Sequence, residues 1–339
     1  MNKFYKYMFF LTMISGTLIS MSSYSWMSMW IGLEINLLAI IPLLKSSKNI
    51  FPSESAIKYF ITQAITSAII MFTIVWNLNY YEYPLTAQSH SISMILSSAL
   101  LTKMGAAPFH FWFPEVMDGL NWTNNIIMLT WQKIAPFILI MYNMKLNFFF
   151  SVIIISSAII GGIMGLNQIS IRKIMAYSSI NHIAWMLSSL MNSHSIWLIY
   201  FTIYSFISLT LIINLINSKC FFLKQMYSTM NMNKSMKLFF LFSFLSLGGL
   251  PPFLGFFPKW LTINNLIENK FYIMSLLLIM STLITLFFYI RITFSSMTLK
   301  SSEFINNKFI FKPKFSTSMI NSFNLTGLIL CMFSTNMLL

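Results

Sequence analysis

The chain has 339 residues, of which 57% are hydrophobic and only 8% are charged, and its formal net charge is +14. Roughly 25% of the residues in a typical soluble domain are charged, so a soluble protein of this length could not cover its surface with so few polar groups. The composition therefore predicts an integral membrane protein. Cys220 and Cys331 show neither a C-x-x-C pattern nor metal-ligand spacing, which argues against a disulfide scaffold and a cysteine-ligated iron–sulfur or zinc site.

Apolar segments follow one another along the whole chain. A transmembrane helix needs about 20 mostly apolar residues to cross a hydrocarbon core roughly 30 Å thick. This template predicts an all-α protein with about eleven transmembrane helices. Their approximate bounds are 4–22, 24–44, 57–78, 91–113, 121–143, 147–166, 172–191, 194–216, 237–257, 271–294 and 317–338. Residues 1–6 lead directly into the first segment without a small-residue cleavage site, so we expect no cleavable targeting peptide.

The positive charges predict the topology, because connections on the matrix or cytoplasmic side of a membrane protein carry an excess of Lys and Arg. Only Lys145 and Lys270 lie in the connections opposite the N-terminus. Fifteen cations lie on the N-terminal side: Lys3, Lys6, Lys45, Lys48, Lys58, Arg172, Lys173, Lys219, Lys224, Lys234, Lys237, Lys300, Lys308, Lys312 and Lys314. We therefore expect the N-terminus to face the matrix or cytoplasm and the C-terminus to face the opposite side. Topology accounts for most of the net charge, so we expect no nucleic-acid partner.

Two segments of the chain match at an offset of 144 residues. The segments 108–115 and 252–259 both read Pro-Phe-x-x-aromatic-Phe-Pro followed by a charged residue. They lie in the fourth and ninth predicted spans, which run in opposite directions, as inverted-topology repeats require. The predicted organisation is a first five-helix repeat, a second inverted five-helix repeat, and a matrix-side loop with a C-terminal helix. Their bounds are 1–144, 145–296 and 297–339.

Each repeated segment is expected to be a broken helix, because proline removes a backbone donor and its ring clashes with the preceding turn. The residues predicted to break the helices are Gly105, Pro108, Gly248, Gly249, Pro251 and Pro252. Discontinuous helices at matching places in two halves are typical of the ion sites of transporters. A pair of kinks that serve packing alone is the alternative.

Four charged residues lie in or beside the predicted spans, away from the loops. Glu34, Lys103 and Lys133 lie within the second, fourth and fifth spans, and Lys259 follows the second helix break. Each such residue costs roughly 2.5–3.5 kcal/mol on insertion scales, so it must pair, lose its charge or contact water. Lysine can release its proton when it is desolvated, whereas arginine stays charged. We therefore predict that these four residues transfer protons; an ion pair of Glu34 with one lysine is the structural alternative.

Weaker candidates accompany these four residues. His182, at the centre of the seventh predicted span, either relays protons or only forms a hydrogen bond with a neighbouring helix. His110, Glu115 and Asp118 lie at the matrix-side end of the fourth span, where they form either a proton entrance or an interfacial cap. Arg291 is expected to extend its side chain to the membrane interface. No nucleotide-binding or haem-binding pattern occurs, so we expect this chain to carry no electrons.

Together these features resemble the chain 2 family of mitochondrial NADH:ubiquinone oxidoreductase, the antiporter-like membrane-arm subunits of respiratory complex I. The most specific stretch is 103–116 (KMGAAPFHFWFPEV), supported by 32–34 (GLE) and by 248–256 (GGLPPFLGF). The eleven predicted spans are similar to the animal form of the family. The abundance of residue types with A/T-rich codons suggests an insect or other arthropod mitochondrial gene.

The resemblance implies a role in proton translocation across the mitochondrial inner membrane, coupled to electron transfer from NADH to ubiquinone. It implies that Glu34 pairs with Lys103, and that Lys133 and Lys259 continue a hydrated axis on which His182 also lies. This chain is expected to bind no cofactor, because FMN, iron–sulfur clusters, NADH and ubiquinone belong to other subunits of the complex. The expected partners are neighbouring antiporter-like subunits, other membrane subunits and lipids. A stand-alone cation/proton antiporter and a structural subunit that moves no protons are the alternatives.

Overall fold

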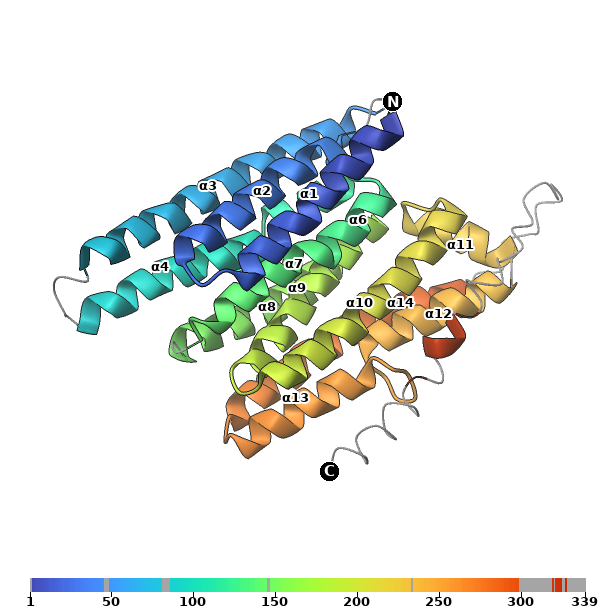
Figure 1. The fold of residues 1–339 in the computed structure, drawn as a ribbon. Helices are drawn as coiled ribbons and strands as arrows, with labels where there is room; N and C mark the ends of the chain where they lie inside the picture. Colours follow the sequence, from blue (N-terminus) through green and yellow to red (C-terminus); the bar gives the residue numbers. More distant parts are fainter. Residues whose placement is uncertain are drawn as a thin grey trace. The chain divides into compact units, whose positions relative to one another are not determined.

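The computed structural model of the protein, drawn in Figure 1, describes residues 2–45, 49–80, 86–144, 147–232 and 234–298, together with 319, 321–324 and 327. Across these ranges every named element is an α-helix, and an isolated β-bridge joins Ser170 to Phe222. The predicted all-α class is confirmed. Some predicted features lie outside the described residues: most of the span at 317–338, Cys331, and the loop cations Lys48, Lys145, Lys300, Lys308, Lys312 and Lys314.

Several helices have the length and composition of membrane spans. Five are long and apolar enough to cross a bilayer: Trp26–Leu44, Phe51–Asn77, Asn147–Gly165, His194–Ser218 and Tyr272–Thr298. Large apolar side chains such as Leu38, Ile65 and Phe287 are exposed on these helices, which suits surfaces that face lipid rather than water. These helices confirm a multi-pass membrane protein, whereas the count of eleven spans stays a prediction.

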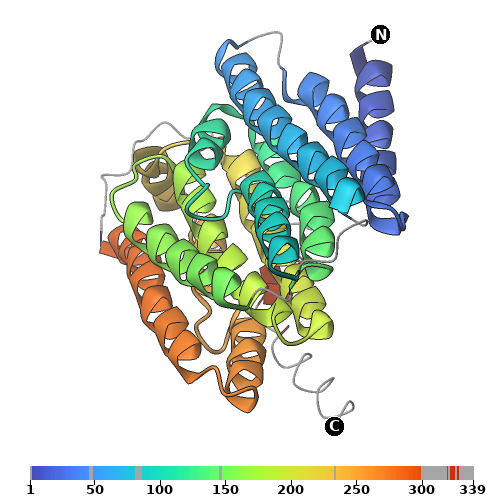
Figure 2. The same ribbon diagram turned by 90° about the vertical axis from the view of Figure 1, so that its left-hand side faces the viewer.

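The chain forms two compact units, Met1–Ile153 and Ile154–Leu339. The first contains α1 (Asn2–Ser22), α2 (Trp26–Leu44), α3 (Phe51–Tyr80), α4 (Thr86–Met104), α5 (Trp112–Gly119), α6 (Trp122–Leu129) and α7 (Trp131–Met141). Figures 1 and 2 show α1, α2 and α3 side by side. A Cβ atom on Gly16 of α1 would lie 2.8 Å from the backbone nitrogen of Asn36 on α2. Small residues permit this close approach between membrane helices.

The second unit is built around one helix that is buried along its length. The boundary between the two units falls within α8 (Asn147–Gly165). The remaining helices of the second unit are α9 (Ile171–Leu190), α10 (His194–Ser218), α11 (Leu223–Met232), α12 (Lys234–Gly248), α13 (Phe256–Glu268) and α14 (Tyr272–Thr298). Every residue of α9 from Ile174 to Leu190 is buried, and this helix contacts α10, α13 and α14. A Cβ atom on Gly161 of α8 would lie 2.8 Å from the backbone nitrogen of Asn181 on α9. The relation of Gly16 to Asn36 therefore recurs at an offset of 145 residues.

Breaks in the helices correct the bounds of three predicted spans. The fourth, expected at 91–113, is helical to the end of α4 and resumes with α5; the ninth, expected at 237–257, is helical to the end of α12 and resumes with α13. These two breaks were predicted, but a third was not. The fifth span, expected at 121–143, divides into α6 and α7 at Thr130. The Thr130 hydroxyl donates to the carbonyl of Ile126 at 2.7 Å, a contact that often bends helices.

The sequence did not predict α11, a short helix outside the expected spans. The described residues near the C-terminus contact α10. Asn321 and Asn214 exchange side-chain hydrogen bonds of 3.1 and 3.2 Å, and the Asn324 side chain donates to the Thr210 hydroxyl at 3.0 Å. The backbone carbonyl of Asn324 also accepts from the Leu254 nitrogen at 3.4 Å, so this segment reaches the break between α12 and α13.

Candidate functional site

The first helix break positions Lys103 in the last turn of α4. Gly105 has a left-handed backbone (φ 76°), and its nitrogen donates to the Thr102 carbonyl at 3.1 Å. The nitrogen of Ala106 donates to the Leu101 carbonyl at 3.1 Å. These two bonds form a Schellman turn, which ends a helix at a glycine. Lys103 is thereby held, buried, at the negative end of the α4 dipole.

The second break repeats this turn at the offset of 144 residues. Gly249 has φ 74°, its nitrogen donates to the Ser246 carbonyl at 3.0 Å, and the nitrogen of Leu250 donates to the Leu245 carbonyl at 3.3 Å. The other predicted break residues flank the two turns. Pro108 follows the first turn and is joined to Ala107 by a cis peptide bond; Gly248 ends α12, and Pro251 and Pro252, also joined by a cis bond, follow the second turn.

Lys259 lies in the first turn of α13 and folds back onto the end of α12. Its buried ammonium group donates a hydrogen bond of 2.8 Å to the carbonyl oxygen of Gly248. This carbonyl is among those that the end of a helix leaves without an intrahelical partner. A Cβ atom on Gly249 would lie 2.8 Å from Cδ and 2.9 Å from Nζ of Lys259. Gly249 is therefore needed both for its backbone conformation and for the space that Lys259 occupies.

Lys133 lies in the first turn of α7, directly after the break at Thr130. Only 1% of its surface is exposed. Its ammonium nitrogen lies 5.6 Å from the ring centroid of Phe113, at the start of α5. An ammonium group at this distance over an aromatic face is stabilised by a cation–π interaction. The sequence correctly predicted that this lysine is buried, but it did not predict the aromatic contact.

Glu34 interacts with Lys103 without forming a direct ion pair. Glu34 is partly exposed on α2 and lies within range of a Coulombic interaction with the ammonium of Lys103. Within the described residues no lysine lies at ion-pair distance from the Glu34 carboxylate, whereas Lys58 forms ion pairs with Glu54 at 3.2 Å and with Glu115 at 3.1 Å. The structural alternative for Glu34, a direct ion pair with a buried lysine, is therefore not formed among the described residues.

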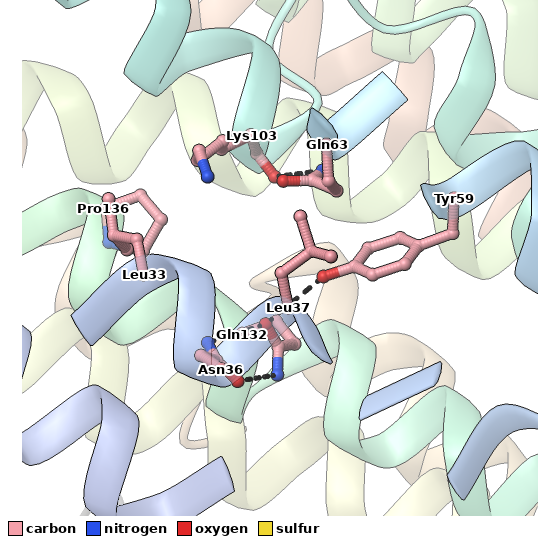
Figure 3. Close-up of a pocket in the computed structure, with 8 residues that line it drawn as sticks. All are labelled: Leu33, Asn36, Leu37, Tyr59, Gln63, Lys103, Gln132 and Pro136. Atoms are coloured by element: carbon pink, nitrogen blue, oxygen red, sulfur yellow. Dashed lines mark hydrogen bonds between the residues drawn. The ribbon is translucent and has the colours of Figure 1, made fainter. Parts of the chain in front are cut away.

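A polar cavity adjoins Lys103, with room for about one water molecule. Figure 3 shows its lining residues: Leu33, Asn36, Leu37, Tyr59, Gln63, Lys103, Gln132 and Pro136. The side chains of Asn36 and Gln132 exchange hydrogen bonds of 3.0 and 2.9 Å, and the Tyr59 hydroxyl donates to Gln132 Oε1 at 3.4 Å. Gln63 donates to the backbone carbonyl of Lys103 at 3.4 Å.

These uncharged residues are not among the predicted site residues. Asn36, Gln63 and Gln132 are amides within apolar helices, and this placement was the available signal, since buried polar groups require hydrogen-bond partners. The arrangement can hold water through its amide and hydroxyl groups next to the Lys103 ammonium.

His182 lies near two tyrosines that are not among the predicted site residues. The imidazole is buried on α9, and its Nδ1 forms a hydrogen bond of 2.9 Å with the hydroxyl of Tyr200 on α10. The ring of Tyr204, one turn further along α10, has its centroid 4.9 Å from that of His182. The spacing of four residues, which places both tyrosines on one face of a helix, was the available signal. These contacts fit both readings of His182, as a relay and as a structural hydrogen-bonding group.

The three residues expected at the matrix-side end of the fourth span, His110, Glu115 and Asp118, lie in different surroundings. The carboxylate of Glu115 is exposed and ties α5 to α3 through its ion pair with Lys58, which favours the interfacial cap for this residue. His110 is buried in the turn between α4 and α5, where its Nδ1 lies 3.2 Å from the Pro108 carbonyl. Asp118 lies in the last turn of α5. Arg291, expected only to reach the interface, donates to the carbonyl of Leu166 just beyond α8 at 2.6 Å.

The described residues contain no group of three or more His, Cys, Asp or Glu side chains arranged to hold a metal ion. The polar chemistry of the site is instead that of lysines, amides and hydroxyl groups near helix ends. Such groups bind water, and the lysines among them can also release protons.

Comparison with known proteins identifies the family. A family model described as "NADH:quinone oxidoreductase/Mrp antiporter, TM" matches residues 23–285. The chain belongs to this family. It is 46% identical over 335 residues to NADH-ubiquinone oxidoreductase chain 2 of Anopheles gambiae, covering 97% of this chain and 98% of the relative. It is 44% identical to chain 2 of Locusta migratoria over 89% of this chain and 88% of the relative, and 40% identical to that of Loxodonta africana over 86% and 85%.

Chains of solved membrane complexes share the fold. A chain of respiratory complex I from Thermus thermophilus with bound aureothin superimposes with a TM-score of 0.85 at 21% identity, covering 96% of this chain and 78% of that chain. A chain of the Mrp complex from Dietzia sp. DQ12-45-1b gives a TM-score of 0.73 at 13% identity, covering 84% of this chain and 59% of that chain. The helical architecture is thus shared with chains of these two membrane complexes.

Proposed function

We propose that this chain is a core membrane subunit of respiratory complex I in the mitochondrial inner membrane. It takes part in proton translocation coupled to electron transfer from NADH to ubiquinone. The observation that carries this proposal is the burial of Lys103, Lys133 and Lys259 at helix ends in a chain of this family. The redox cofactors then belong to other subunits, and the partners are membrane-arm subunits, including antiporter-like ones, and lipids.

The proposed proton-transfer residues are Glu34, Lys103, Lys133 and Lys259, with His182 in a secondary role. The ammonium of Lys259 donates to a neutral backbone carbonyl, and that of Lys133 lies over an aromatic ring. Loss of the proton from Lys259 would therefore leave no carboxylate without a partner in this contact. Lysine is suited to this exchange, since its ammonium can be deprotonated when it is desolvated.

The proposed architecture is a pair of inverted five-helix repeats, 1–144 and 145–296, followed by a C-terminal helix. Two local features support it. The Schellman turns at Gly105 and Gly249 correspond at an offset of 144 residues, and the glycine contacts of Gly16 and Gly161 correspond at an offset of 145. The distribution of loop cations supports an N-terminus towards the matrix and a C-terminus towards the intermembrane space.

The test measures proton pumping by the assembled complex with Lys133→Ala or Lys259→Ala in this chain. Each change should lower the rate of coupled proton translocation by on the order of a hundredfold, the lower range for one acid–base group. Lys45→Ala, which removes an exposed cation at the end of α2, should leave pumping unchanged. A normal ratio of protons to electrons in assembled Lys133→Ala and Lys259→Ala complexes would favour a subunit that moves no protons.

A second measurement separates the subunit from a stand-alone cation/proton antiporter. The purified chain is reconstituted alone in liposomes, and cation-driven proton movement is followed with a pH-sensitive dye. We expect no transport, because the proposed function is driven by electron transfer elsewhere in the complex. Transport by the single chain, abolished by Lys133→Ala, would instead identify an antiporter.

A further inference from the structure

The reciprocal amide pair beside the cavity joins two helices that carry charged residues of the proposed site. Asn36 is two residues after Glu34 on α2, and Gln132 directly precedes Lys133 on α7. Each amide donates to the other, at 3.0 and 2.9 Å. A paired amide fixes the orientation of both side chains, since rotation of either one breaks both bonds. The pair therefore holds α2 and α7 at a set separation.

The helix α3 extends this connection to the third charged helix. Tyr59 of α3 donates to Gln132 Oε1 at 3.4 Å, and Gln63, one turn along the same face, donates to the carbonyl of Lys103 on α4 at 3.4 Å. Tyr59 and Gln63 are both buried. No charged residue of the proposed site lies on α3, yet its side chains contact the helices of Lys103 and Lys133.

The hydrogen-bond directions give the cavity a fixed polarity. Because Gln132 Oε1 accepts from both Asn36 and Tyr59, the hydroxyl hydrogen of Tyr59 points to Gln132 and the lone pairs of the phenol oxygen remain available as acceptors. Figure 3 shows this hydroxyl at the cavity, on the opposite side from the Lys103 ammonium. The lining of the cavity thus includes both an acceptor, the Tyr59 oxygen, and a lysine whose ammonium can donate, and the cavity has room for about one water molecule.

We propose that Asn36, Gln132, Tyr59 and Gln63 are positioning residues for proton transfer at Lys103. They hold a water molecule on its ammonium and keep the helix of Glu34 in register with the helix of Lys133. Amide groups neither take up nor release protons near neutral pH, so the network orients the proton carriers without being one itself. This inference rests on the proposed function and deepens it.

The first test uses Tyr59→Phe, which removes one hydroxyl and keeps the ring. A structure of the assembled complex at a resolution that reveals water should contain a water molecule within hydrogen-bonding distance of Lys103 Nζ in the natural protein, and none in Tyr59→Phe. The rate of coupled pumping should fall roughly fivefold, the factor that corresponds to about one net hydrogen bond. Absence of the water molecule from the natural protein would overturn the proposal.

The second test exchanges the two amides. Asn36→Gln and Gln132→Asn each change the combined length of the pair, whereas the double variant restores it. Each single variant should lower the proton-to-electron ratio, and the double variant should recover it. Asn124→Leu is the matched control, because Asn124 also ties its helix to α2, through the carbonyls of Leu43 and Leu44, but does not line the cavity. It should leave the ratio unchanged in the complexes that assemble.

The outcomes distinguish this inference from the proposed function. If Lys103→Ala abolishes pumping while Tyr59→Phe and both single amide variants pump with the natural ratio, the positioning network is refuted and the proposed function stands. If Lys103→Ala pumps normally, the role of Lys103 itself fails, and the network has nothing to position. Equal loss of the ratio in Asn124→Leu and the amide variants would reduce the network to a structural tie.

Discussion

Lys259 donates a hydrogen bond of 2.8 Å to the carbonyl of Gly248, the last residue of α12, from a position eleven residues further along the chain. The bond crosses the helix break, so the cation neutralises the negative end of α12 while lying at the start of α13. A cation at a helix C-terminus is favourable by about 0.3–1 kcal/mol at exposed sites and more in partly buried ones. This contact thus explains why the ammonium is tolerated in the interior.

A Lys259→Arg substitution separates this structural role from proton transfer. Arginine keeps the positive charge and can donate to the Gly248 carbonyl, but it does not release its proton. We expect the complex to assemble and oxidise NADH, and coupled proton translocation to fall on the order of a hundredfold, the lower range for loss of an acid–base group. The rate of proton translocation is measured from the acidification of reconstituted vesicles, followed with a pH-sensitive dye. Pumping at the natural rate with arginine in place would reduce Lys259 to a helix cap.

Two adjacent glycines at the end of α12 should respond differently to alanine. Gly249→Ala places a side chain on a left-handed backbone (φ 74°) and 2.8 Å from Lys259 Cδ. A residue other than glycine in the left-handed conformation costs about 1–2 kcal/mol, so Gly249→Ala should lower the melting temperature. Gly248→Ala should be tolerated, because the nearest atom to its Cβ would be Cδ2 of Tyr289, at 3.6 Å. Thermal denaturation of the purified chain in detergent compares them, and equal melting temperatures would contradict this account.

Glu34→Gln tests the electrostatic link to Lys103. The substitution removes the negative charge of Glu34 with little change of shape. Because Glu34 and Lys103 form no direct ion pair, the substitution breaks no hydrogen-bonded contact between them. Coupled pumping should fall roughly tenfold, a factor that equals about 1.4 kcal/mol and lies within the range for two charges in a protein. Glu268→Gln, at an exposed position on α13, is the control. A similar effect of both substitutions would show that net charge, and not the position of Glu34, is responsible.

Local sequence signals predicted the helix breaks well. The glycine and proline pattern predicted a broken helix in each repeat, and the structure adds left-handed backbones at Gly105 and Gly249; the conformation of a helix end is decided within a few residues. The burial of Lys103, Lys133 and Lys259 followed equally from their apolar surroundings in the chain. In each case the information lay in neighbouring residues.

Tertiary partners could not be predicted in this way. The Asn36–Gln132 pair joins residues 96 positions apart, and neither sequence segment identifies the other. The break at Thr130 was missed because threonine occurs in unbroken helices as well, and the departure of its backbone from helical values (φ −114°, ψ −72°) is visible only in the fold. The contact of Lys133 with Phe113 likewise depends on how α5 and α7 pack. These features follow from helix packing, on which a linear pattern carries little information.

The close approach of α8 to α9 gives a last prediction, on stability. A Cβ atom on Gly161 would lie 2.8 Å from the backbone nitrogen of Asn181 and 2.9 Å from the carbonyl of Tyr177, and backbone atoms of a buried helix cannot move aside easily. Gly161→Ala should therefore destabilise the chain by about 1–3 kcal/mol, as overpacking does. At the adjacent Gly162 the nearest atom would be the Ser281 carbonyl oxygen at 3.3 Å, so Gly162→Ala should cost less. Unfolding of the two variants in detergent measures the difference. A larger loss of stability for Gly162→Ala than for Gly161→Ala would contradict this account. It would mean that α8 packs more tightly against α14 at Gly162 than against α9 at Gly161.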